Sequence, residues 1–141
     1  MVKGRFDHFN INVTNLERSI AFYAQALGLK EHHRKEAEDG SFILVYLTDE
    51  TTSFLMELTW LRDKEGAYEL GDNESHLCFR VGGDYDEARA YHKAMGAVCY
   101  ENEAMGLSSC FVGQRTKKRP LPKMNLAEGE KIAVPPLFAV Q

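Results

Sequence analysis

Three residues of types that bind divalent metals lie at the ends of strand-like segments. His8 lies near the start of FDHFNINV, Glu57 near the end of SFLMELTW, and His76 near the start of SHLCFRV. Two neutral imidazoles and one carboxylate suit a borderline ion such as Ni²⁺, Zn²⁺, Co²⁺ or Fe²⁺. The sequence therefore predicts a metal site built from these three side chains.

The two histidine segments resemble each other, which sets them apart from scattered polar residues. Each begins with histidine and an apolar residue, reaches a valine five positions later, and leads into a predicted helix. A simpler reading stays open for Glu57, because it alternates with Met56 and Leu58 and could face solvent. If Glu57 instead faces the concave side of its module, a cation is needed to offset the burial of its charge.

A strand, a helix and three strands are predicted in the first half of the chain. Residues 6–13 are rich in Phe, Ile and Val, and LERSIAFYAQAL has apolar residues at helical spacing. Thr14 or Asn15 is the expected N-cap of that helix and Gly28 its C-cap. Three further strands are expected, at 29–36, 41–48 and 53–60.

The same order begins again after a polar linker at 61–75. A strand is expected at 76–81, a helix at 84–95 with Asp84 as its cap, and strands at 97–101 and 107–112. The repetition indicates an internal duplication. One β-α-β-β-β unit leaves a sheet face uncovered, so two are expected to pair. We therefore expect an α+β fold in a single domain over 1–141, with module one at about 5–60 and module two at about 76–112.

The segment 113–141 does not fit the repeat. Four basic residues cluster at 115–119 beside Pro120 and Pro122, and a central strand does not readily hold those prolines. We expect an extended segment at 113–131 and a short edge element or tail at 132–140. The basic cluster suits a solvated loop, with anion binding as the alternative. A shifted reading frame near residue 107 is a further hypothesis for the change in composition.

Composition restricts the class of function. The chain has 141 residues and a formal net charge of -4, which argues against nucleic-acid binding. No apolar run is long enough for a membrane span, and no N-terminal signal pattern is present. The three cysteines form no Cys-x-x-Cys pair. They are expected to be reduced, buried thiols in a cytoplasmic protein.

The chain resembles the glyoxalase I branch of the vicinal oxygen chelate superfamily. The resemblance covers about residues 5–106 and is carried by FDHFNINVTNLERSIAFYAQALGLK, FLMELTW and YELGDNESHLCFRV, with support from YDEARAYHKAMGAVCYENEAMG. It implies paired modules, usually a homodimer, and metal sites in clefts between modules. Similar bacterial members isomerise the hemithioacetal of methylglyoxal and glutathione, often with Ni²⁺; Co²⁺, Zn²⁺, Fe²⁺ and Mn²⁺ are the other candidate ions. His8, Glu57 and His76 match the first three metal ligands of that family.

The fourth ligand of the family does not transfer. The resemblance implies a Glu on the last strand of module two, after an Asp-Pro-Asp-Gly turn, where this chain has QRTKKRPLPK. Glu128 and Glu130 are the nearest downstream carboxylates, at the wrong spacing. Asn12 and Leu61 stand where glutathione-using members typically have Arg and Asn, which leaves the identity of the thiol open.

The expected chemistry is proton transfer next to a polarised carbonyl. A metal holding both oxygens of a hemithioacetal acts as a Lewis acid, and a carboxylate moves the proton from C1 to C2. Glu57 is the candidate for that carboxylate, and with one Glu instead of two we expect weak activity. Phe54 and Trp60 are candidate pocket residues, although core packing explains them equally well. The remaining histidines are expected at the surface: His32, His33 and His92.

Two alternatives to a lyase remain open. Two His and one Glu also form the facial triad of Fe²⁺ oxygenases, which ring-cleaving dioxygenases of the same fold use. The missing fourth ligand instead favours a non-catalytic small-molecule-binding module that keeps the cleft without the chemistry.

Overall fold

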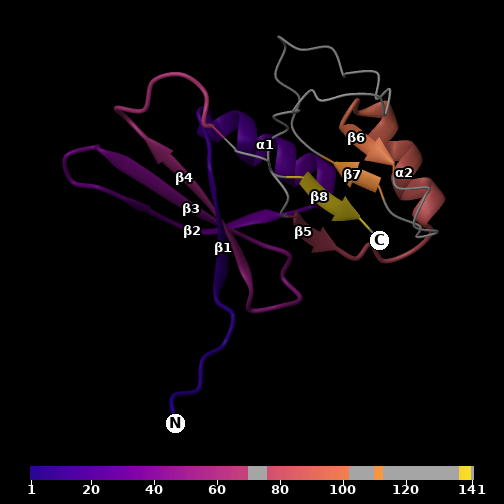
Figure 1. Cartoon of the computed structure of the whole chain (residues 1–141), viewed down its shortest axis with the longest axis horizontal. Coiled ribbons are helices and arrows are strands. Elements are labelled where there is room, and N and C mark those ends of the chain that lie inside the picture. Colours follow the sequence, from indigo (N-terminus) through magenta and orange to yellow (C-terminus); the bar gives the residue numbers. More distant parts are fainter. Residues whose placement is uncertain (70–75, 102–109, 113–136, 141) are drawn as a thin grey trace, which may run out of the picture. The chain divides into compact units, whose positions relative to one another are not determined.

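The computed structural model describes residues 1–69, 76–101, 110–112 and 137–140. The chain divides into two compact units, Met1–Tyr68 and Glu69–Gln141. Each contains one helix and a four-stranded sheet, so the expected α+β class is confirmed (Figure 1). No helix within the described ranges is long and apolar enough to cross a membrane.

Unit 1 follows the predicted β-α-β-β-β order. Its elements are β1 (His8–Asn12), α1 (Leu16–Leu27), β2 (Lys30–Glu36), β3 (Phe42–Thr48) and β4 (Leu55–Leu61). The strands lie in the order β1-β4-β3-β2, with β1 parallel to β4 and the other neighbours antiparallel. The first and last strands of the unit are therefore neighbours in the sheet, although they lie far apart in the sequence.

Local sequence determines where α1 begins and ends. The Asn15 side chain accepts a hydrogen bond of 2.9 Å from the backbone N–H of Arg18 at the helix start. Gly28 ends the helix with a left-handed φ of 69°, a conformation that glycine adopts without a Cβ penalty. The predicted bounds of this helix are confirmed.

One face of the unit 1 sheet forms the apolar core. Ile11, Val45, Leu47, Met56 and Leu58 are all buried on it. Helix α1 packs against β4 and brings Leu16, Tyr23 and Ala26 into the same core. The opposite face carries the residues that alternate with these positions, among them Asn10, Tyr46 and Glu57.

Unit 2 repeats the strand arrangement of unit 1. Its elements are β5 (His76–Phe79), α2 (Tyr85–Ala94), β6 (Val98–Glu101), β7 (Cys110–Val112) and β8 (Leu137–Val140). The order is β5-β8-β7-β6, with β5 parallel to β8. Strand β8 thus has the place in this sheet that β4 has in the other, as expected for a duplicated unit.

The expectation of an edge element at 132–140 is wrong. Strand β8 pairs with β5 on one side and with β7 on the other. The apolar run LFAV begins only after Pro135-Pro136 in the sequence, so all four strand residues can donate to the sheet. The segment 113–131 lies outside the described residues.

The expected solvent exposure of two residues in unit 2 is also wrong. His92, expected at the surface, is 2% exposed. It shares one face of α2 with the partly buried Ala88 and Met95, so the helix turns it inward. Cys78, expected in the core, is exposed, because it alternates along β5 with the partly buried Leu77 and Phe79.

Candidate active site

A row of polar side chains crosses the unit 1 sheet on the face opposite the core. Asn10 of β1 pairs with Glu57 of β4, Glu57 pairs with Tyr46 of β3, and Tyr46 pairs with His33 of β2. Directly paired residues on neighbouring strands project from the same face. The row therefore contributes one side chain from every strand of the sheet.

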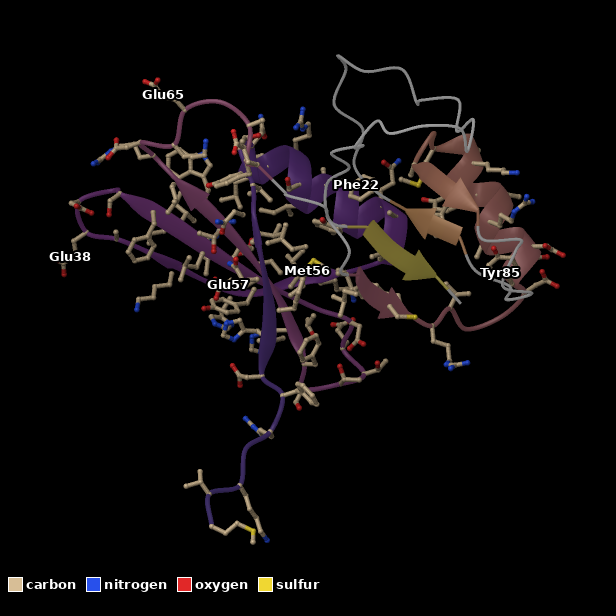
Figure 2. The ribbon with its side chains drawn as sticks, in the orientation of Figure 1. Phe22, Glu38, Met56, Glu57, Glu65 and Tyr85 are labelled. Carbon is tan, nitrogen blue, oxygen red and sulfur yellow. The ribbon has the colours of Figure 1, made fainter. Side chains whose placement is uncertain are left out.

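Glu57 lies in this row and is nevertheless buried. Its neighbours in β4, Met56 and Leu58, point into the core on the other face, and Figure 2 labels Met56 and Glu57. Glu57 is 8% exposed because the polar side chains around it cover it. It therefore faces neither the core nor open solvent, and its charge needs compensation.

Hydrogen bonds supply part of that compensation. Asn10 Nδ2 donates to Glu57 Oε1 at 2.8 Å, and Thr59 Oγ1 donates to the same oxygen at 2.8 Å. Tyr46 pairs directly with Glu57 across β3 and β4, and its hydroxyl interacts with this carboxylate and lowers the pKa of Glu57. The two donors to Oε1 hold the carboxylate in place and fix its orientation.

These contacts keep Glu57 ionised. Burial alone raises the pKa of Glu57, but the hydrogen bonds from Tyr46, Thr59 and Asn10, together with the nearby His8, outweigh it and lower the pKa below the usual value. The hydrogen bond to Glu57, with partial burial, raises the pKa of Tyr46 to about 12. At neutral pH the pair is therefore a carboxylate and a neutral phenol, the form in which Glu57 can bind a cation or accept a proton.

His8 presents its free nitrogen to Glu57. Its Nδ1 lies 2.9 Å from Asp7 Oδ2, and a carboxylate can only accept, so the hydrogen of this bond belongs to Nδ1. Its Nε2 lies 3.5 Å from Glu57 Oε2. When the imidazole is neutral, two lone-pair atoms face each other across this gap, and a cation between them would relieve their repulsion.

The separation of these two atoms fits a shared metal ion. Two ligands at about 2.1 Å from one ion lie about 3.0 Å apart at neighbouring octahedral positions and about 3.4 Å apart in a tetrahedral site. The 3.5 Å between His8 Nε2 and Glu57 Oε2 is close to both values. An Asp that holds the far nitrogen of a metal-binding His is a common outer partner of such sites. The residues present therefore suit a divalent metal.

Asp7→Asn is expected to weaken Co²⁺ binding by the purified chain about tenfold. The amide oxygen can still accept from His8 Nδ1, but it lacks the negative charge that makes the imidazole a stronger ligand. Titration calorimetry of the metal-free variant measures the affinity. The matched control is Asp63→Asn, which neutralises another exposed Asp of unit 1, paired with Arg62. Equal affinities in the two variants would contradict the role of Asp7.

The structure describes the other predicted site residues only in part. His76 is the first residue of β5 in unit 2, and its side chain is outside the described part. Glu128 and Glu130 also lie outside the described residues. Trp60 pairs with Ile43 and projects from the core face, opposite to Glu57, while Phe54 directly precedes β4 and is partly exposed.

No cluster of three or more His, Cys, Asp and Glu side chains suited to a metal is found where the structure describes side chains. The cluster around His8 and Glu57 brings together two of the three residues that were expected to bind a metal. The third expected ligand, His76, belongs to the part whose side chains are not described.

Several site residues were missed from the sequence. Asn10 and Thr59 each lie two positions after a predicted ligand in the same strand, and period-two alternation could have identified them. Asp7 directly precedes His8 and gave no signal of its own. Tyr46 required the register of β3 against β4, which no local pattern gives.

Known proteins resemble this chain in sequence and in fold. The sequence pattern of the Glyoxalase/Bleomycin resistance protein/Dioxygenase superfamily matches residues 5–100. Lactoylglutathione lyase from Neisseria meningitidis serogroup A is 35% identical over 99 residues, which cover 69% of this chain and 71% of that protein.

Solved structures show the same fold at lower identity. A mutant glyoxalase I from Zea mays aligns with a TM-score of 0.70 and 20% identity over 96% of this chain. The trypanothione-dependent glyoxalase I of Leishmania major aligns with a TM-score of 0.64 and 21% identity, over 98% of this chain and 86% of that one. This chain spans only 44% of the maize chain.

Proposed function

Because the chain belongs to the glyoxalase/bleomycin resistance protein/dioxygenase superfamily, we propose that it is a metal-dependent lyase of the lactoylglutathione lyase type. Its reaction is the isomerisation of the hemithioacetal that a 2-oxoaldehyde such as methylglyoxal forms with a thiol. The observation that carries the proposal is the buried, ionised Glu57 with its Oε2 3.5 Å from His8 Nε2. The relatives named lactoylglutathione lyase support the class of reaction.

His8 and Glu57 are the proposed ligands from unit 1. His76 is the proposed third ligand, because it begins β5 as His8 begins β1. Glu128 and Glu130 remain the candidates for a fourth. Ni²⁺ is the first candidate ion, followed by Co²⁺, Zn²⁺, Fe²⁺ and Mn²⁺. When bound, such an ion supplies Lewis-acid polarisation of the substrate oxygens.

Glu57 is the proposed proton carrier. Its carboxylate takes the proton from C1 of the hemithioacetal, and the electrons of the broken C–H bond move toward the neighbouring carbonyl oxygen. The same carboxyl group then returns the proton to C2, and the hydroxyl proton at C1 moves to the oxygen at C2, so the isomerisation needs no other reactant. Asn10 and Thr59 hold Oε1, so Oε2 is the oxygen oriented toward His8.

The remaining parts of the proposal concern assembly and substrate. We propose a homodimer in the cytoplasm that acts on a small-molecule thiol adduct. Glutathione is the reference thiol, although Asn12 and Leu61 replace the residue types with which glutathione-using relatives are expected to contact it. A thiol other than glutathione is therefore included in the test.

The test is turnover by the purified, metal-free chain after addition of single metal ions. Methylglyoxal is mixed with glutathione or with another low-molecular-weight thiol, and loss of the hemithioacetal is followed spectroscopically. Turnover that requires added Ni²⁺ or Co²⁺ is expected. Absence of turnover with every metal and thiol would reject the lyase proposal, and oxygen uptake with catechols and Fe²⁺ would replace it with a dioxygenase.

A further inference from the structure

Tyr46 lies next to three other side chains of the candidate site, those of Glu57, His33 and His8. It pairs directly with Glu57 across β3 and β4, so its hydroxyl projects from the same face of the sheet as the Glu57 carboxylate. Its ring stacks on the His33 imidazole, with ring centroids 4.2 Å apart and planes within 9° of parallel. The His8 imidazole meets the same ring edge-on, with centroids 5.7 Å apart. One side chain of β3 thus joins the candidate ligands to the edge strand β2.

A β-bulge explains how the edge strand supplies this stack. The register between β2 and β3 shifts between Glu31 and His33, so His32 is an extra residue opposite Tyr46. A bulge redirects the side chains on either side of it, and here it brings two consecutive imidazoles together. His32 Nδ1 lies 2.7 Å from His33 Nδ1, and the two rings meet at 76°. His32 thereby orients the ring that lies flat on Tyr46.

The carboxylates of β2 are kept away from this row. Arg34 pairs with Glu31 at 2.6 Å and lies 3.7 Å from Glu36. Glu31 and Arg34 lie opposite Leu47 and Val45, which face the core side of the sheet. The bulge therefore separates imidazoles on one face from carboxylates on the other, so that no acid of β2 competes for the Tyr46 hydroxyl.

We propose that Tyr46 is a positioning residue of the metal site, with its phenol fixing the Glu57 carboxylate and the His33 stack fixing Tyr46. The inference rests on the proposed function, because it concerns the same carboxylate. Asn10 and Thr59 both donate to Oε1, and Tyr46 lies directly opposite Glu57 on the neighbouring strand, so the carboxylate cannot turn freely. Its Oε2 therefore stays directed at His8 Nε2.

Tyr46→Phe tests the hydroxyl while it keeps the ring and the stack. The variant is expected to bind Co²⁺ about tenfold more weakly than the unchanged chain, the usual effect of losing an outer partner of a metal ligand. His33→Ala is expected to shift the affinity in the same direction by a smaller factor. The matched control, Tyr91→Phe, removes a phenol from the exposed surface of α2 and is expected to leave the affinity unchanged. Affinity is measured by calorimetry at a temperature where every variant is folded.

A second readout uses the metal-free chain. Tyr46→Phe, Glu57→Leu and the double variant are unfolded in urea, and non-additivity of about five- to tenfold in the unfolding equilibrium constant is expected for a direct hydrogen bond. Co²⁺ affinity that is unchanged in Tyr46→Phe overturns the proposal, because a merely structural tyrosine would alter only the unfolding. If the unchanged chain binds no Co²⁺, the proposed function fails. The double-mutant cycle of Tyr46 and Glu57 then decides by itself whether Tyr46 holds Glu57. Additive effects of the two substitutions on the unfolding equilibrium would overturn that claim.

Discussion

Replacing Glu57 with glutamine is expected to lower kcat about 10³-fold at saturating Ni²⁺. Glutamine keeps the size of the side chain but cannot accept a proton from the substrate. It also replaces one carboxylate oxygen by an amide NH₂ group, which only donates, so the side chain loses either the oxygen that faces His8 or the acceptor for Asn10 Nδ2. Steady-state kinetics with the methylglyoxal–thiol hemithioacetal measures the loss.

A control substitution and an unfolding measurement show whether the loss of activity is due to the missing carboxylate. Glu65→Gln makes the same chemical change at an exposed loop position of unit 1, which Figure 2 labels, and is expected to keep full activity. Urea unfolding shows whether Glu57→Gln remains folded under the assay conditions. A folded Glu57→Gln variant with activity within threefold of the unchanged chain would remove Glu57 from the mechanism.

Replacing Leu58 with alanine is expected to lower the free energy of unfolding by about 3 to 4 kcal/mol. Leu58 is 0% exposed and lies in β4, where it pairs with Ile11 on one side and Val45 on the other. Removing its side chain leaves a cavity at the centre of the unit 1 core. Urea denaturation monitored by circular dichroism measures the change.

The same strand supplies the control for this core substitution. Leu61 ends β4 and is 37% exposed, so Leu61→Ala is expected to cost less than about 1 kcal/mol. Leu58 also adjoins Glu57 in sequence but points to the opposite face, so the folded fraction of Leu58→Ala is expected to retain its turnover. Equal destabilisation by the two substitutions would show that β4 is not held by this core.

Local patterns were sufficient to predict most of the secondary structure. Helix α1 has a polar N-cap, amphipathic spacing and a terminal glycine, and these are short-range signals. Asp84 gives α2 the same kind of start, since it accepts from the backbone N–H groups of Asp86 and Glu87. The duplicated strand order followed from the two similar histidine segments.

Pairing between distant strands could not be read from the sequence. Strand β8 is separated from its partner β5 by most of unit 2, and its apolar run was too short to distinguish an inner strand from an edge. His92 was expected at the surface because it has no counterpart in the other module, whereas α2 packs against its own sheet and turns this residue inward. No local sequence pattern marks either contact.

The sequence suggested candidate ligands for the site but not the residues that surround them. His8 and Glu57 came from residue type and repetition, and the structure places their side chains 3.5 Å apart. The burial of Glu57 depends on Tyr46 and on the donors from two other positions, which meet only through the strand register. No local sequence pattern predicts the bulge at His32 either, so the stacking of His33 on Tyr46 is seen only in the folded structure.

X-ray absorption spectroscopy of the nickel-loaded chain tests the central claim most directly. Nitrogen and oxygen neighbours are expected at about 2.0 to 2.2 Å from the nickel ion, with the outer-shell pattern of imidazole and no sulfur. Loading of His8→Gln should show less imidazole than loading of the unchanged chain. A nickel ion surrounded by sulfur, or one whose imidazole signal does not change when His8 is replaced, would contradict a metal site built on His8 and Glu57.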